Sequence, residues 1–138
     1  MIMVVIIVIG AQAWAYGMTL SVSQQRLTVA GQIARADIEG AKVIGWANLP
    51  LGTLNGAKTE AVHTSAVRYF DQSGTPLANS TGAIYSVKRQ TIDTGFTLVG
   101  SSYALTDSTR RRIIVSVTLV PKNQQVVQFA TLLAKDGI

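Results

Sequence analysis

The chain opens with twenty residues that carry no charged side chain, MIMVVIIVIGAQAWAYGMTL, and its first charged residue is Arg26. A helix from Met1 to Gln25 would be about 37 Å long, enough to cross a hydrocarbon layer roughly 30 Å thick. Such a helix would be apolar on nearly every side, so it has no polar face to present to water. We therefore predict an apolar half-helix over residues 1–25, buried in a membrane or among other helices.

The next stretch keeps a helical period, but only on one face. No proline occurs between Ser21 and Leu49, and apolar or small residues recur there at steps of three and four. This spacing predicts an amphipathic half-helix over residues 26–49 that continues the first one. The residues expected to pack on the rest of the protein are Leu27, Ala30, Ala34, Ile38, Ala41 and Ile44.

The end of this long helix is predicted at the motif Asn48-Leu-Pro-Leu-Gly. Pro50 disfavours helical geometry in the residue before it, and Gly52 permits a turn, so residues 50–65 are expected to form a connecting loop. Glycine costs about 1 kcal/mol in a helix interior. We expect any local unwinding of the helix between Gly17 and Gly31.

The remainder of the chain changes to short β-branched and aromatic segments separated by turn residues. An antiparallel sheet of four or five strands over residues 66–138 is predicted, with one face covered by the amphipathic half-helix. The fold class is therefore α+β. The expected strands are 66–70, 83–87, 95–105, 112–120 and 126–134, with hairpin loops at 71–76 and 121–125.

Composition narrows the chemistry that this chain can perform. It has no cysteine and one histidine, His63, so it lacks a thiol nucleophile, a thiolate metal site and a disulfide framework. A lone imidazole without a partner makes neither a catalytic triad nor a metal cage. The aspartates are scattered and show no dense calcium-ligand spacing. We predict no catalytic residue, no metal and no cofactor.

One charge run stands out in a chain that has 12 Lys+Arg, 7 Asp+Glu and a net charge of +5. The three arginines of TRRRI, residues 109–113, alternate between the two faces of a strand, and a solvated strand entry explains them. Alternatively, Arg110 and Arg112 could pair with Asp37 or Glu39 of a neighbouring subunit, or attract DNA weakly. No aromatic residues are interleaved with the arginines, so specific nucleic-acid recognition is not predicted.

These features together resemble the type IV pilin superfamily. The resemblance covers the whole chain: an apolar half-helix, an amphipathic half-helix, a loop opened by NLPLG, and the segments VRYFDQSGTPL and RRIIVSVTLVPKNQQVVQFATLLAKDGI. It rests on architecture more than on a strict motif. The closing hairpin and its tail are most similar to minor pilins and to the pseudopilins of type II secretion.

The resemblance implies a subunit that is made with a short basic leader, cut by a membrane peptidase, N-methylated and held in the inner membrane of a bacterium. It then implies packing into a helical filament at the cell surface. The chain departs from the family because no Lys/Arg-Gly leader precedes the apolar run, and Val5 stands where the family usually has glutamate. Basic residues normally flank the cytoplasmic end of a span, yet here they follow it. We expect a chain that is mature or truncated at its N-terminus.

The predicted function is structural, with copies of the same chain as partners, together with the inner membrane and the pilus or secretion assembly machinery. The alternative is a membrane-tethered pseudopilin or assembly module that does not form the bulk filament. An envelope enzyme with a signal anchor is disfavoured because no nucleophile and base can be paired. The residues expected in the filament core or membrane, whose small members let helices approach closely, are Met1, Ile2, Val4, Val5, Ile6, Ile7, Val8, Ile9, Gly10, Ala13, Trp14, Gly17 and Leu20.

Overall fold

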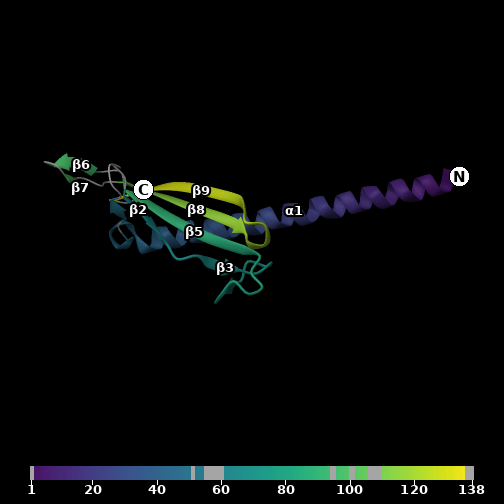
Figure 1. The fold of residues 1–138 in the computed structure, drawn as a ribbon, viewed down its shortest axis with the longest axis horizontal. Coiled ribbons are helices and arrows are strands. Elements are labelled where there is room, and N and C mark those ends of the chain that lie inside the picture. The colour runs from purple at the N-terminus through teal and green to yellow at the C-terminus, as the bar shows by residue number, and fades with distance from the viewer. Residues whose placement is uncertain are drawn as a thin grey trace.

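A computed structural model describes residues 2–50, 52–54, 61–93, 96–99, 102–105 and 110–135, with side chains for residues 12–50, 52, 61–93 and 110–135. The chain forms one long helix, α1 (Ile2–Ile44), and an antiparallel sheet that packs on the C-terminal half of that helix. The N-terminal half of α1 extends beyond the sheet (Figure 1). The predicted α+β layout of a long helix on an antiparallel sheet is confirmed.

Helix α1 ends earlier than the position of Pro50 predicts. Gly45 adopts φ 80° and ψ 159°, a backbone conformation that residues other than glycine rarely adopt. A short 3-10 helix, η1 (Trp46–Asn48), follows it. Glycine 45 therefore terminates the helix five residues before the proline. The helix is continuous through Gly17 and Gly31, so the expected unwinding between them is absent from the described chain.

Replacing Gly45 with alanine should therefore destabilise the protein. Forcing a side chain into this conformation costs about 1–3 kcal/mol, and urea unfolding of the full chain in detergent should show a loss of that size. Gly40→Ala is the matched control, because Gly40 lies inside α1 and a Cβ there would have no described atom within 4 Å. We expect this control to stabilise the helix by about 0.5–1 kcal/mol. Equal effects of the two variants would contradict the assigned role of Gly45.

The main sheet contains seven antiparallel strands among the described residues, and its three longest strands lie side by side. Strand β5 (Tyr85–Asp93) pairs with β8 (Arg110–Leu119), which pairs with the edge strand β9 (Gln124–Ala134) across the turn η2 (Val120–Lys122). The remaining strands of this sheet are short: β1 (Thr53–Leu54), β2 (Ala61–Thr64), β3 (Arg68–Phe70) and β4 (Pro76–Leu77).

Strands β2 and β3 share the other edge of β5, one after the other. Ala61 of β2 pairs with Asp93, and Phe70 of β3 pairs with Tyr85, with a one-residue change of register between them. Ser65 occupies that step: its N–H donates to the Arg89 carbonyl at 2.9 Å, and its Oγ accepts the Arg89 N–H at 3.1 Å. The step matters because it sets the position of Arg68, which is used below.

The strand predictions hold for the two long C-terminal strands and for the segments that became β3 and the start of β5. Three details differ. Strand β2 lies inside the predicted loop 50–65. Strand β5 continues to Asp93, beyond the predicted end at residue 87, because its second half is polar and was not recognised as a strand. The predicted strand 95–105 is instead a separate hairpin made of β6 (Phe96–Val99) and β7 (Ser102–Leu105).

Small residues bring α1 close to the sheet. Ala30, Ala34 and Ala41 are fully buried, and Ile33 is buried beside them. Opposite them, alternate residues of β5 and β8 are buried, as one face of a strand should be. These sheet residues are Tyr85, Val87, Ile113, Val115, Val117 and Leu119.

Two residues of the expected helix stripe lie outside this core. Leu27 is 50% exposed because it precedes Ala30, the first buried residue of α1, and Ile44 is 40% exposed at the last turn of the helix. Ile38 is half-buried and packs against the core. The buried stripe therefore covers Ala30 to Ala41 and includes Ile33 and Asp37, which the spacing rule had not assigned to it.

The buried hydroxyl of Tyr85 allows a test of what an unsatisfied polar group costs in this core. Its ring is fully buried, and its hydroxyl has no hydrogen-bond partner among the described residues. Removing an unsatisfied buried hydroxyl should stabilise a protein, so Tyr85→Phe should raise the free energy of unfolding by about 1–2 kcal/mol. Tyr69→Phe, at a half-buried tyrosine in β3, is the control and should change it by less than about 0.5 kcal/mol.

The same variant should alter the alkaline stability of the protein. Burial raises the pKa of Tyr85, while the charge of Arg26 acts in the opposite direction. Because the folded pKa lies above the unfolded value of about 10, this stability is present below about pH 10 and is lost as the pH rises through the folded pKa. Tyr85→Phe should therefore lose less stability than the wild type above about pH 10. Parallel curves for the two proteins would contradict this account.

Candidate functional site

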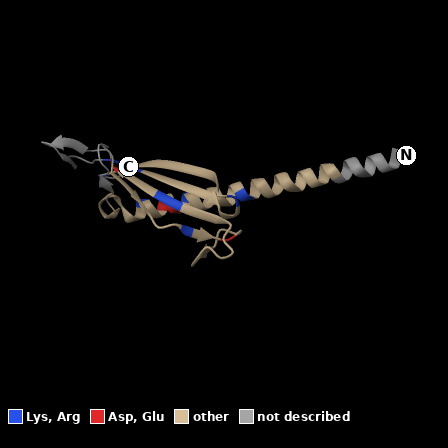
Figure 2. Cartoon of the chain, viewed as in Figure 1, with Lys and Arg blue, Asp and Glu red and all other residues tan. Residues whose placement is uncertain are grey.

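The projecting part of α1 is the most unusual surface of the protein. Every residue from 12 to 25 is exposed, and five of them carry large apolar side chains. Figure 2 shows no charged residue on the described part of this projection before Arg26. A contiguous exposed apolar surface of this kind marks an interaction site rather than a surface in contact with water. The five residues are Trp14, Tyr16, Met18, Leu20 and Val22.

The hydroxyl groups on this part of the helix do not oppose its burial. Thr19 Oγ1 donates to the Ala15 carbonyl at 2.8 Å, and Ser23 Oγ donates to the Thr19 carbonyl at 3.0 Å. Thr28 does the same one turn further on, to the Gln24 carbonyl at 3.0 Å. A polar group that is already satisfied within its own helix can enter an apolar environment at little cost. These three hydroxyl groups therefore add little to the cost of burying the projecting helix.

The expected filament-core residues divide into two groups. Ala13, Trp14, Gly17 and Leu20 lie on the exposed projection, and a Cβ added to Gly17 would meet no described atom within 4 Å. The others, Met1 to Gly10, lie outside the residues whose side chains are described. In the described part of the chain, no helix combines the length and the hydropathy needed to cross a membrane.

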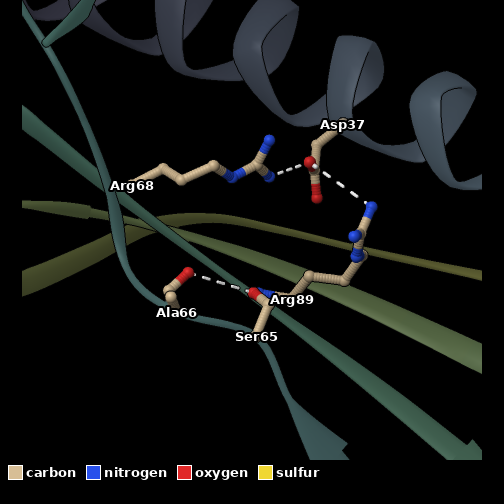
Figure 3. Close-up of polar contacts among 5 residues, drawn as sticks. All are labelled: Asp37, Ser65, Ala66, Arg68 and Arg89. Carbon is tan, nitrogen blue, oxygen red and sulfur yellow. Dashed lines mark hydrogen bonds and ion pairs between the residues drawn. The ribbon is translucent and has the colours of Figure 1, made fainter. Parts of the chain in front are cut away.

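The first of two ion pairs fixes α1 to the sheet at the buried carboxylate of Asp37 (Figure 3). The Asp37 side chain is 4% exposed, Arg68 of β3 donates to its Oδ1, and Arg89 Nη1 of β5 lies 3.7 Å from the same oxygen. Burial, followed by the charge of Arg89, lowers the pKa of Arg68. The other carboxylate oxygen of Asp37, Oδ2, is buried without a hydrogen-bond partner in the described chain.

Both acids of the predicted intersubunit charge pairs have a partner within their own chain. The Asp37 carboxylate is paired inside its own chain, because the helix face that carries it turns toward β3 and β5 rather than outward. Glu39 is exposed and pairs with Lys42 at 3.0 Å along the same helix. Arg110 and Arg112 are exposed on β8, and their pairing with a neighbouring subunit stays a prediction.

The second ion pair joins β8, β5 and the connector that follows α1. Arg111 Nε donates to Asp93 Oδ1 at 3.0 Å, and the two side chains are 3% and 0% exposed. Its Nη1 donates to the Leu49 carbonyl at 3.0 Å and also to the Trp46 carbonyl. The guanidinium lies over the Trp46 ring, 4.4 Å from its centroid. Arg111 thereby ties the end of the helix to the sheet.

Sequence reasoning missed Arg111, although a signal was present. The strand alternation places Ile113, Val115 and Val117 on the buried face, and counting two residues back from Ile113 puts Arg111 on that same face. The middle arginine of the run is therefore a buried structural group, whereas its neighbours Arg110 and Arg112 face outward.

No group of three His, Cys, Asp or Glu side chains in the described part of the chain could hold a metal ion. His63 is half-buried on β2, where it pairs in the ladder with Thr91. Comparison of the chain with protein-family models, curated proteins and solved structures finds no match. The functional argument therefore rests on the chain's own residues.

Proposed function

We propose that this protein is a structural subunit of an extracellular, type IV pilus-like filament that polymerises through its N-terminal helix. The observation that carries the proposal is the exposed, uncharged and apolar-rich surface of α1 between residues 12 and 25, which projects beyond the sheet. Burying one large apolar side chain contributes about 1.5–3 kcal/mol. Five of them on one projection supply a strong drive out of water, which is opposed by the entropy of fixing the subunits.

The separation of the chain into a packed part and a projecting part supports this role. The sheet and the C-terminal half of α1 have a core of their own, so the projecting half contributes nothing to that core and is available to other copies. In this proposal the protein is not an enzyme, and its partners are copies of itself, the inner membrane before assembly, and an assembly machinery. The mature subunits then lie in a filament at the cell surface of a bacterium.

The test is electron cryo-microscopy of filaments sheared from the cell surface, with mass spectrometry of the subunit's N-terminus on the same sample. We expect a filament whose centre is made of α1 helices and whose outside is made of the sheet. Protein that is found only in the membrane fraction, unpolymerised, would overturn the proposal in favour of a membrane-tethered pseudopilin or assembly module.

A further inference from the structure

We propose, resting on the function proposed above, that Arg26 and Lys122 bind the headgroup of an anionic phospholipid while the subunit is held in the membrane. Both side chains line one pocket of about 140 Å³, Arg26 from α1 and Lys122 from η2. Figure 1 shows that the turn between β8 and β9, which contains η2, lies at the end of the sheet from which α1 projects. The pocket therefore lies at the junction between the apolar projection and the sheet.

The lining of this pocket is basic and apolar. Its other residues are Ile84, Leu119 and Pro121, and no acidic residue of the described chain lines it. Neither Arg26 nor Lys122 makes a hydrogen bond or an ion pair with another described residue. Two cations that share one pocket repel each other, and an anion bound between them removes that repulsion. The group that fits is therefore an anion attached to an apolar body.

The phosphate diester of a phospholipid has this chemistry. An arginine binds a phosphate through two parallel N–H···O bonds, and a lysine adds a point charge with three donors. The glycerol and the upper part of an acyl chain would lie against the three apolar residues of the lining. A zwitterionic headgroup brings its own cation, so it carries no net negative charge to neutralise the pocket. The ligand is therefore an anionic lipid rather than a zwitterionic one.

The position of Arg26 along α1 selects the headgroup layer as the source of this anion. Val22 is the last of the five large apolar residues on the projection, and Arg26 follows it by four residues, about 6 Å along the helix axis. The headgroup region on each side of a bilayer is about 5–7 Å thick. With α1 along the bilayer normal and the projection in hydrocarbon as far as Val22, Arg26 lies level with the phosphates. The contact would then hold the η2 end of the sheet against the membrane surface.

Native mass spectrometry of the full-length chain in detergent tests this contact, with phosphatidylglycerol and phosphatidylcholine added in equal amounts. Each basic residue near an anionic surface contributes about 5-fold in affinity, so we expect about 25-fold more phosphatidylglycerol than phosphatidylcholine to be retained. Arg26→Gln or Lys122→Gln alone should reduce this preference about 5-fold. The two changes together should remove it.

The matched control is Arg35→Gln combined with Lys88→Gln. It removes the same total charge from one exposed arginine of α1 and one exposed lysine of the sheet, neither of which lines the pocket. Arg35 is nine residues from Arg26, about 14 Å further along the axis, which is beyond the Debye length at physiological ionic strength. This variant should keep the preference for phosphatidylglycerol. Circular dichroism checks that every variant keeps the fold.

A second measurement locates the contact in a bilayer. The full-length chain is placed in phosphatidylcholine nanodiscs, with or without phosphatidylglycerol, and its lysines are acetylated with a water-soluble reagent. Phosphatidylglycerol should slow the acetylation of Lys122 several-fold and leave that of Lys88, an exposed residue of β5, unchanged. Excess inorganic phosphate added to the phosphatidylcholine nanodiscs should not protect Lys122, because a free phosphate lacks the apolar body that fits the lining.

Four results would overturn this inference and leave the proposed function intact. They are equal retention of the two lipids, an equal loss of preference in the control variant, unchanged acetylation of Lys122 in phosphatidylglycerol, and protection of Lys122 by inorganic phosphate. A chain that does not enter nanodiscs at all would overturn both, because the proposed function requires a membrane-held stage before assembly.

Discussion

Replacing Arg111 with alanine is expected to lower the free energy of unfolding by about 3–5 kcal/mol, because the change leaves Asp93 as a buried carboxylate without its cation. The same change removes donors from the carbonyls of Trp46 and Leu49, so the connector after α1 loses its attachment to the sheet. Urea unfolding of the full chain in detergent, followed by circular dichroism, measures the loss.

Arg112→Ala is the matched control for this prediction. Arg112 is the next residue of the same arginine run, but it is exposed on the other face of β8, so its replacement should cost at most about 1 kcal/mol, the range of a surface ion pair. The difference between the two variants isolates the burial of Arg111 from the loss of one positive charge. If the two arginines proved equally important, the buried ion pair would not have the role assigned to it.

Replacing Leu20 with aspartate is expected to abolish polymerisation while the sheet and the C-terminal half of α1 stay folded. Leu20 lies on the projecting helix, where no buried contact within its own chain would be lost. A charge moved into an apolar assembly costs at least about 3 kcal/mol, which is more than a 100-fold loss in the affinity of one contact. Sedimentation and electron microscopy measure polymer, and circular dichroism measures the fold.

The control for Leu20 is Leu132→Asp. Leu132 has nearly the same exposure, 59% against 57%, but it lies on the outer face of edge strand β9. Polymer should survive this change with at most a modest loss. Polymerisation that resists Leu20→Asp, or that is lost equally in both variants, would contradict assembly through the projecting helix.

The regular elements of this protein were predictable because each shows one period over a long stretch. The apolar run at the N-terminus and the alternation through Ile113 to Leu119 indicated the long helix and the central strand, both of which are present. The hairpin loop at 121–125 was predicted from its turn residues, and Asn123 there adopts a left-handed conformation with φ 49°.

The features that failed prediction depend on contacts between distant segments. Asp37 looked like a solvated helix charge, but its partners come from β3 and β5, and the one-residue step at Ser65 sets the position of Arg68. Gly45 ended the helix before the stronger signal of Pro50 because of its own backbone conformation. The burial of Asp37 does not follow from local propensity, which is why the candidate site was predicted in its apolar part and missed in its ionic part. Gly45, by contrast, is a local helix-stop signal that the sequence carried.

The ion pairs of Asp37 and Arg111 should also affect how the protein responds to mechanical load. Asp37 is joined to the sheet midway along its contact with α1, and Arg111 is joined to the connector at the end of that contact. Because α1 runs along the sheet (Figure 1), a pull on its N-terminus loads both attachments and the alanine-lined interface together, in shear. A shear geometry has no end from which the contacts can peel one at a time. The sheet and the part of α1 that packs on it should therefore transmit tension as one body. The force at which they separate should be set by the unfolding rate.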